Sequence, residues 1–497
     1  MVAWQQSERQ PLSRFESMKP IRLNPEQEKA VKDMIEFVTD GTQGSVAFMG
    51  AAGTGKTTTL QHFARKFIGL FGEKTILFIT PTHKAAGVLR EKMPKGINVD
   101  TIQKTIGVKT KKNKDKEEFV EPTVSTLHRQ AESLKERLPD LKLIIVDESS
   151  MVSQNNANFL QAIADLCNHL PIVFSGDPFQ LPPVAKKSKD LDQSEIEEET
   201  EYSKDMCSQF ACASYSIKLE KVERHTGPVL DYATSIRENF KQPNKFPLSS
   251  IKETDSLIEI FNSEAIWMQD FFASVRKNGL STRAITHKNN TCNKLTTALR
   301  FALYGHKSYN GWMPGENITF PSYTILPNGE KIYSCTDAQI KAAEIVEINK
   351  LFKKFDYLTP TKQLPRSLSI SLQGQFQKLT VVTSRFPAEF EVFVPLIGNR
   401  DMQEHRSQIR TKLTQLANYN IIENDRLVCA WDAMRQLNNY FPTIYSANVM
   451  TVHKSQGSSF DYVFVHKDVE ECKADYSNAL LYVAATRAKK GLYFLNP

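Results

Sequence analysis

A glycine-rich segment near the amino terminus has the composition of a phosphate-binding loop. Residues 50–58 read Gly-Ala-Ala-Gly-Thr-Gly-Lys-Thr-Thr, which fits G-x-x-x-x-G-K-[ST] and follows an apolar run at 46–49. In such a loop, backbone N–H groups and the start of the next helix surround the phosphates of a nucleotide. Lys56 is expected to reach the β- and γ-phosphates, and the Thr57 hydroxyl to bind Mg²⁺. The predicted nucleotide contacts are Gly50, Gly53, Thr54, Gly55, Lys56, Thr57 and Thr58.

Two carboxylates follow a second apolar run, Leu143-Ile-Ile-Val146. At the carboxyl edge of a parallel sheet, Asp147 would hold Mg²⁺ and Glu148 would deprotonate the attacking water. Alone, an acidic pair after a strand is usually a solvated strand end, but beside a phosphate loop it predicts hydrolysis of a nucleoside triphosphate. A third run, 172–175, leads to Gln180, which is either a sensor of the γ-phosphate or part of a proline-stiffened turn.

The elements that must position these residues alternate along the chain. Strands are expected at 46–49, 75–79, 143–146 and 172–175, with helical patterns between several of them. A second alternating block starts at 216, with strands at 217–219, 284–286, 448–452, 462–465 and 492–495. The second block is interrupted between 305 and about 445. There, 368–372, 379–383 and 390–394 are β-rich, and one amphipathic helix is expected near 400–417. The pattern predicts an α/β protein with two parallel-sheet domains and a mostly β insertion.

The predicted division has three parts and a tail. The first domain covers 21–215, the second 216–305 together with 445–497, and a β-rich, barrel-like domain at 306–444 is inserted into the second. Two insertions interrupt the first domain: a hairpin within 107–128 with a lysine-rich tip, and an acidic surface loop at 185–207 for which a partner-binding role stays open. Residues 1–20 are expected to be a flexible tail.

Composition excludes several classes of protein. The 497 residues suffice for about three or four domains. Lys and Arg outnumber Asp and Glu, 63 against 56, which permits a polyanionic partner. Seven scattered cysteines, none in a Cys-x-x-Cys pair, argue against a disulfide framework or structural zinc. Without a long apolar run or signal peptide, the expected location is the cytoplasm (the host cytoplasm if phage-encoded), with no membrane partner.

Further motifs, from about residue 23 to 494, resemble those of the superfamily 1 helicases. Their order resembles the 1B branch, which includes RecD-like enzymes and the Dda helicase of T-even phages. Leu23-Asn-Pro-Glu-Gln27 is similar to the Q motif, whose glutamine reads adenine, so the resemblance implies that Gln27 binds ATP. The other matches are motif Ia at 80–86, motif III at 177–183, motif IV at 219–224, motif V at 451–457 and motif VI at 480–487.

The resemblance implies two RecA-like domains with ATP in the cleft between them and a nucleic acid strand crossing both. Arg224 and Arg487 would then contact the γ-phosphate, Arg487 as an arginine finger worth roughly 10³–10⁵ in rate. The candidates for polynucleotide contact are Thr82, His83, Thr101, Asn289, Thr451 and His453. The phosphate-contact candidates Thr82, His83, Thr451 and His453 have an alternative interpretation each, as a helix cap or an ordinary buried hydrogen bond.

The hairpin at 108–121 lies where 1B relatives carry a pin that splits the duplex. Phe119 is its one aromatic residue. Its ring would either stack on a terminal base pair or pack the hairpin onto its own domain. The insertion at 306–444 resembles the small barrel domain that supports the pin in Dda-type enzymes.

The resulting prediction is an ATP-dependent DNA helicase that translocates 5′ to 3′ on single-stranded DNA and unwinds duplexes. The expected ligands are ATP, Mg²⁺, single-stranded DNA and single-strand/duplex junctions, with single-strand-binding or recombination proteins as candidate partners of a monomer. Two alternatives stay open: a nucleic-acid-stimulated ATPase that displaces proteins or remodels RNA, and a motor or adaptor subunit of a recombination complex. These residues do not choose among replication, recombination and repair, or between DNA and RNA.

Overall fold

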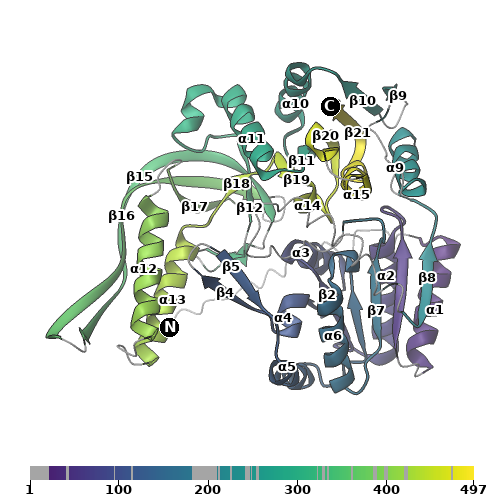
Figure 1. The fold of residues 1–497 in the computed structure, drawn as a ribbon, viewed down its shortest axis with the longest axis horizontal. Coiled ribbons are helices and arrows are strands. Elements are labelled where there is room, and N and C mark those ends of the chain that lie inside the picture. Colours follow the sequence, from purple (N-terminus) through teal and green to yellow (C-terminus); the bar gives the residue numbers. More distant parts are fainter. Residues whose placement is uncertain are drawn as a thin grey trace, which may run out of the picture.

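In this computed structural model, three sheets make up most of the fold (Figure 1). The structure describes residues 22–40, 44–94, 96–113, 116–181, 210, 213–223, 227–240, 247, 249–252, 257–321, 323–326, 329, 331–332, 335–359, 362–383, 389–396, 401–418, 424–471 and 474–496. Within these ranges, no helix is long and apolar enough to cross a membrane. The expected tail at 1–20 and the acidic loop at 185–207 lie outside the described residues.

The first sheet is parallel, with strand order β3-β2-β6-β7-β1-β8. Its strands are β1 (Ser45–Gly50), β2 (Ile76–Thr80), β3 (Asn98–Thr101), β6 (Leu143–Val146), β7 (Ile172–Gly176) and β8 (Tyr215–Leu219). Side chains of alternate residues enter opposite faces, so Val46 and Phe48 join one core and Ala47 the other. The first core is covered by α1 (Pro25–Thr39), α2 (Lys56–Phe71) and α3 (His83–Lys92), and the second by α4 (Ile102–Ile106), α5 (Val124–Arg137) and α6 (Gln154–Leu166).

Strand β8 corrects one prediction. The sequence pattern assigns 217–219 to the second block, but Ile217 pairs with Phe48 in the first sheet. Ile217 and Leu219 are buried in the core beneath α1, while Tyr215, Ser216 and Lys218 are exposed. The alternation identifies a strand with one buried face, yet it carries no information about which sheet that face meets. The start of the second domain therefore moves beyond residue 219.

The second sheet has the order β19-β11-β20-β21-β10-β9, and all its pairs except β9 with β10 are parallel. Its strands are β9 (Ile251–Lys252), β10 (Leu257–Phe261), β11 (Thr282–Thr286), β19 (Val449–Thr451), β20 (Phe460–Val465) and β21 (Ala488–Leu495). The helices are α9 (Pro228–Glu238), α10 (Glu264–Asn278), α11 (Asn289–Tyr304), α14 (Val452–Ser455) and α15 (Ala474–Ala485). Short 3₁₀ turns are η1 (Ser149–Met151), η2 (Gly279–Ser281), η3 (Gly305–Tyr309) and η4 (Lys467–Val469). The predicted pair of parallel-sheet domains is thus confirmed.

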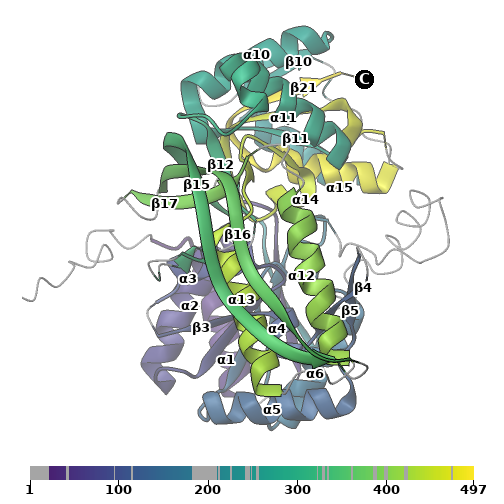
Figure 2. The same cartoon turned by 90° about the vertical axis from the view of Figure 1, so that its left-hand side faces the viewer.

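The inserted domain contains an antiparallel sheet with the order β17-β16-β15-β12-β18. Its strands are β12 (Asn317–Phe320), β15 (Thr336–Thr359), β16 (Lys362–Thr383), β17 (Phe390–Pro395) and β18 (Tyr445–Ser446), with a small ladder of β13 (Thr324–Ile325) and β14 (Lys331–Ile332). Among the described strands, the five-stranded sheet does not close into a barrel, because β17 and β18 at its two ends do not pair with each other. Strands β15 and β16 form a long curved ribbon that runs down one side of the molecule (Figures 1 and 2).

Two helices, α12 (Asp401–Asn418) and α13 (Asn424–Tyr440), pack against this ribbon. Leu413 and Leu437 meet Ile348 and Ile370 in one buried cluster. The mostly β character of the insertion is confirmed, but the expectation of a single helix near 400–417 is incomplete. Helix α13 was not predicted, although its buried residues Ala430, Ala433, Met434 and Leu437 recur at the three- and four-residue spacing of a helix.

The predicted hairpin is present. Strands β4 (Lys109–Asn113) and β5 (Lys116–Val120) pair antiparallel, with Phe119 opposite Thr110. In both views it projects from the first domain toward the side where α12 and α13 lie (Figures 1 and 2). The side chain of Phe119 lies outside the described residues, so its stacking role stays a prediction.

Buried polar contacts fasten the insertion to the second domain. Arg300 on α11 donates from Nε to Glu316 Oε1 (2.5 Å) and from Nη2 to the Gly311 carbonyl (2.6 Å), and it lies over the Trp312 ring. The Arg300 and Glu316 side chains are 11% and 4% exposed. Because water cannot replace a lost partner at this depth, the pair ties the position of β12 to α11.

We expect Glu316→Ala to destabilise the junction between α11 and β12 by about 3–5 kcal/mol, because it leaves the Arg300 guanidinium buried without its charge partner. Hydrogen exchange followed by mass spectrometry should show faster exchange in peptides that cover β12. Glu347→Ala, at an exposed position of β15, is the matched control. Equal exchange in the two variants would show that the ion pair does not hold the junction.

Candidate nucleotide site and nucleic-acid interface

The phosphate loop spans the turn from the end of β1 to the start of α2. Gly53 and Gly55 have φ values of 91° and 83°, in the left-handed region that glycine adopts without steric cost. A Cβ atom on Gly55 would also collide with Nε2 of Gln27. The glycines therefore shape a loop whose N–H groups and helix start are available to phosphates.

Lys56, Thr54 and the first turn of α2 complete the loop. Lys56 Nζ donates to the carbonyls of Gly50 (2.7 Å) and Ala51 (3.1 Å), and its charge acts on Asp147. Thr54 is buried and donates to the Ala51 carbonyl at 2.9 Å, while Thr57 and Thr58 are half-buried. The ammonium group of Lys56 thus lies between the loop and the first carboxylate.

Residues from α1 and from the segment after β8 support the same loop. Gln27 Nε2 donates to the Thr54 carbonyl (3.0 Å), and Asn24 Nδ2 donates to Glu223 Oε1 (2.8 Å). The Glu223 N–H in turn donates to the Gly53 carbonyl at 2.9 Å. Arg224, the next residue, lies outside the described residues, so its role and the contact of Gln27 with adenine both stay predictions.

Asp147 directly follows β6 and is close enough to Lys56 to interact with its charge. Its Oδ1 accepts from the Glu148 N–H (3.1 Å) and from Ser175 Oγ (3.2 Å). Burial, and secondarily the nearby charge of Glu148, raise the pKa of Asp147 to about 6 although Lys56 opposes this. A buried pair of carboxylates favours a bound cation. Asp147 together with the Thr57 hydroxyl therefore fits Mg²⁺, which keeps few protein ligands and takes the rest from phosphates and water.

Glu148 combines an unusual backbone with an unpaired oxygen. Its φ is 54°, and its buried Oε2 makes no hydrogen bond within the described residues. A Cβ atom placed on Gly457 would lie 4.0 Å from Glu148 Oε1. The candidate general base of the first domain thus faces the 451–457 turn of the second.

Tyr482 on α15 joins the two domains at the phosphate loop. Its hydroxyl donates to Asp177 Oδ2 (2.6 Å) and accepts from the Ala52 N–H (3.1 Å). Asp177 is fully buried, and burial with the charge of Asp177 raises the pKa of Tyr482 well above its ordinary value. Tyr482 was not predicted as a site residue. The sequence feature that could have indicated it is a single hydroxyl group in the otherwise apolar stretch 479–485.

Gln180 lies at the same boundary. Its N–H donates to the Asp177 carbonyl (3.1 Å), and its side chain is buried with Oε1 unpaired within the described part of the chain. The next residue, Leu181, packs into the core that surrounds α15. Gln180 therefore occupies a position from which it can respond to the phosphates and to the second domain.

Arg487 is buried in the second domain. It donates from Nε to the Val483 carbonyl (3.1 Å), from Nη1 to the Ser458 carbonyl (2.9 Å) and from Nη2 to Thr486 Oγ1 (3.0 Å). Ser458 follows Gly457, the residue that faces Glu148. The guanidinium thus contacts the residue next to the turn that faces Glu148, and a role as arginine finger stays a prediction.

The polynucleotide candidates of the first domain lie at one edge of its sheet. Thr80 pairs with Thr101 at the ends of β2 and β3. Thr82 caps α3 by accepting from the Ala85 N–H (3.2 Å), and Thr101 caps α4 by accepting from the Lys104 N–H (3.4 Å). The helix-cap alternative therefore holds for Thr82, while His83, the first residue of α3, is exposed.

A corresponding edge exists in the second domain. Thr286 pairs with Thr451 at the ends of β11 and β19, and Asn289 begins α11. Thr451 is the N-cap residue of α14 without a side-chain cap bond. His453 Nε2 lies 2.9 Å from the Tyr476 hydroxyl, and burial, then the neighbouring His287, lowers the pKa of His453 to about 4. His453 is thus half-buried and hydrogen-bonded to Tyr476, so its contact with a phosphate stays a prediction.

Fold and site together define a P-loop nucleoside triphosphatase with two stacked RecA-like domains. The family model described as "AAA domain" matches residues 28–186, and that described as "UvrD-like helicase C-terminal domain" matches 446–495. A solved Pif1 helicase from Candida albicans has the same fold, with a TM-score of 0.50, 15% identity and coverage of 96% of this chain and 95% of that one.

Sequence relatives agree with this assignment. An uncharacterised protein of Acanthamoeba polyphaga mimivirus is 22% identical over 95% of this chain and 99% of its own length. The ATP-dependent DNA helicase dda of Enterobacteria phage T4 is 22% identical over 94% of this chain and 96% of its own. The ATP-dependent DNA helicase RRM3 of Saccharomyces cerevisiae is 31% identical over 34% of this chain and 22% of its own. Along most of its length the chain is thus similar to superfamily 1 helicases of the Pif1 and dda kinds.

We expect Tyr482→Phe to lower the free energy of unfolding by about 1–3 kcal/mol, because Asp177 and the Ala52 N–H both lose their shared partner. ATP turnover should fall as well, since the hydroxyl connects the loop to the second domain. Urea unfolding and steady-state ATPase assays measure the two effects. Tyr493→Phe, whose ring stacks on Phe464, is the control; a Tyr482→Phe variant no less stable than this control would contradict the bridge.

Proposed function

We propose that this protein is an ATP-dependent DNA helicase that translocates 5′ to 3′ on single-stranded DNA and separates duplex strands. The observation that carries the proposal is that the second domain contacts the first at the phosphate loop and at the neighbouring carboxylate. Tyr482 of the second domain binds the Ala52 N–H in that loop, and Gly457 faces Glu148. A nucleotide bound there touches elements of two domains that can move relative to each other.

In this proposal, the residues around the phosphate loop have distinct roles in ATP hydrolysis. Lys56 and the loop N–H groups hold the β- and γ-phosphates, and Gln27 holds the adenine. Glu148, with its unpaired oxygen, orients and deprotonates the attacking water. Thr57 and Asp147 would hold Mg²⁺, which neutralises the charge of the phosphates. Arg487, released from its carbonyl partners, and Arg224 stabilise the charge on the transferred group.

Domain closure links this chemistry to movement. When Arg487 and the 451–457 turn approach the nucleotide, the second domain is drawn onto the first, and loss of phosphate lets them separate. Gln180 and Asp177 lie between the loop and α15, so they transmit the closure of the domains.

The two motor domains in this proposal are 21–219 and 220–305 with 445–497, and the inserted domain is 306–444.

DNA lies across the two sheet edges in this proposal. Thr82, His83 and Thr101 hold phosphates on the first domain, and Asn289, Thr451 and His453 do so on the second. Helix starts and hydroxyl groups grip a backbone without reading bases, as movement along any sequence requires. The choice of DNA is supported by the helicase relatives, and the direction by the 1B motif pattern.

The hairpin separates the strands in this proposal. It projects from the first domain toward the inserted domain, so a duplex that reaches it would meet the hairpin near that domain (Figure 1). Phe119, near the base of β5, is the residue proposed to stack on the terminal base pair.

Lys56→Ala should abolish ATP turnover and leave binding to single-stranded DNA largely intact, because the lysine contacts the nucleotide loop and not the sheet edges. ATPase rates and fluorescence anisotropy with a labelled oligonucleotide measure the two properties. Lys66→Ala, in the same helix but on its exposed side, is the control. Retained turnover would remove Lys56 from the nucleotide site.

Forked and tailed duplexes test the direction and the reaction together. We expect ATP-dependent unwinding of a duplex with a 5′ single-stranded tail and none with a 3′ tail. The control is the same duplex with a blunt end. Unwinding from the 3′ tail alone would reverse the direction, whereas DNA-stimulated ATPase activity that displaces streptavidin without unwinding would favour the protein-displacement alternative.

A further inference from the structure

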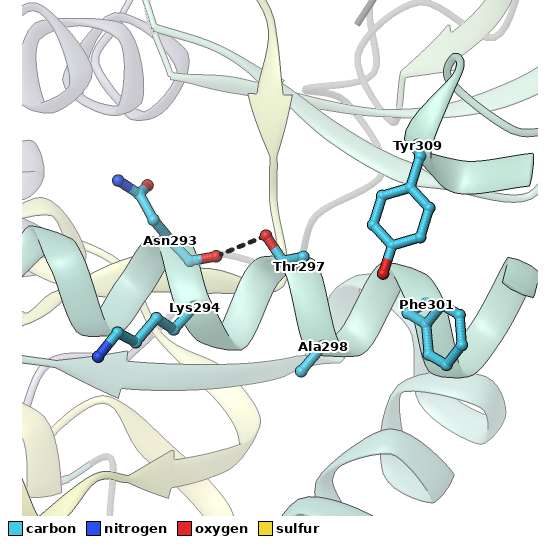
Figure 3. A pocket seen from close by; sticks show the side chains of 6 residues that line it. All are labelled: Asn293, Lys294, Thr297, Ala298, Phe301 and Tyr309. Atoms are coloured by element: carbon cyan, nitrogen blue, oxygen red, sulfur yellow. Dashed lines mark hydrogen bonds between the residues drawn. The ribbon is translucent and has the colours of Figure 1, made fainter. Parts of the chain in front are cut away.

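A hollow on the outer side of α11 is outside the nucleotide site. It has a volume of about 450 Å³ and is lined by Asn293, Lys294, Thr297, Ala298, Phe301 and Tyr309 (Figure 3). We call this set the α11 hollow. Its size lies within the range of sites that hold small organic groups such as a nucleotide.

The α11 hollow follows one side of a helix that is firmly anchored on the other. Leu295 and Leu299 are buried in the second domain, while Asn293, Thr297 and Phe301 follow one another at four-residue spacing on the exposed side. Thr297 Oγ1 donates to the Asn293 carbonyl at 3.1 Å, as Figure 3 shows. The helix therefore presents this stripe on a rigid support.

Aromatic rings occupy the far end of the stripe. Phe301 and Tyr309 are 42% and 51% exposed, although burying such rings is favourable. Their centroids are 5.9 Å apart with planes inclined by 31°, and His306 meets the Phe301 ring edge-on at 5.2 Å. Figure 3 shows Tyr309 reaching from η3 over α11 beside Phe301. Two exposed rings with a hollow beside them form a surface on which a flat group can stack.

The near end of the stripe leads to the proposed DNA track. Helix α11 begins at Asn289, directly after the β11 edge where Thr286 pairs with Thr451. Lys294, one turn further, is exposed and gives the polar half of the hollow a positive charge. The α11 hollow thus lies on the helix whose start follows the edge at which the second domain is proposed to hold phosphates.

We propose that the α11 hollow binds one nucleotide of the single strand beyond the Thr451 edge, with its base stacked on Phe301 and Tyr309 and its phosphate near Lys294. This extends the proposed function and rests on it, because the strand must first lie across the second domain. Stacking on aromatic rings tolerates any base, because every base has a flat π-face. It lengthens the bound segment and slows release of the strand between steps.

Binding of oligothymidylates of increasing length, followed by anisotropy, tests the site. The wild-type protein gains affinity when the oligonucleotide becomes long enough to reach the hollow, and the double variant F301A/Y309A loses that gain, which is expected to be about 5-fold to 100-fold. Y309F keeps the ring and should bind as the wild type does. Y215A removes an exposed ring from β8 and is the matched control.

An abasic linker moved along the longest oligonucleotide locates the stacked base. One position should weaken binding to the wild type and have no effect on F301A/Y309A. Lys294→Ala should reduce the slope of log K against log salt by about 0.7, the value for one phosphate of a single strand. These readouts do not depend on the stability of the variants, because short oligonucleotides bind the core track in every case.

The proposal is overturned if F301A/Y309A and wild type show the same length dependence and the same abasic profile. If single-stranded DNA still stimulates ATP turnover in that case, the proposed function stands and the hollow is a surface for a protein segment instead. If the wild type neither binds single-stranded DNA nor responds to it, the proposed function itself fails.

Discussion

The hydroxyl of Tyr482 connects helix α15 of the second domain to the phosphate loop of the first. A buried Asp177 carboxylate needs a donor, and the Ala52 N–H needs an acceptor; one oxygen serves both. When the domains separate, water can take its place, so the net free energy of the contact is small, about 0.5–1.5 kcal/mol per hydrogen bond. The hydrogen bonds of Tyr482 therefore fix the geometry of the closed domains but contribute little to the free energy of closure. A nucleotide that binds the closed form somewhat better can then shift the equilibrium.

Two departures from ordinary folding rules lie at this boundary. Glu148 adopts a left-handed backbone that costs a residue with a side chain about 1–2 kcal/mol, and its buried Oε2 has no hydrogen-bond partner among the described residues. Asp147 beside it is buried against a like charge. The surrounding sheet, whose central strands are fully buried, supplies the stability that such a site requires.

Short sequence patterns were sufficient to predict much of this architecture. The loop glycines, and the carboxylates after β6, could be predicted because backbone conformation and strand burial leave marks within a few residues. The sheet that receives β8 could not, since its alternation is the same on either sheet. Arg487 was identified by its motif, yet its carbonyl partners depend on how α15 packs against the 458 segment. Thr82 illustrates a different difficulty. Its hydroxyl caps α3, and the same hydroxyl could also contact a DNA phosphate, so the residue type alone does not distinguish a helix cap from a DNA contact.

Only Ala447 and Asn448 separate β18 of the inserted sheet from β19, which leads into the 451–457 turn. Asn448 is itself fixed, accepting from Asn317 and donating to the carbonyls of Gly279 and Thr282. The inserted sheet is thus tied through two residues to the turn that faces Glu148. Because displacement grows with distance from a pivot, any rotation of the second domain about this boundary would be enlarged along the β15–β16 ribbon of the inserted domain.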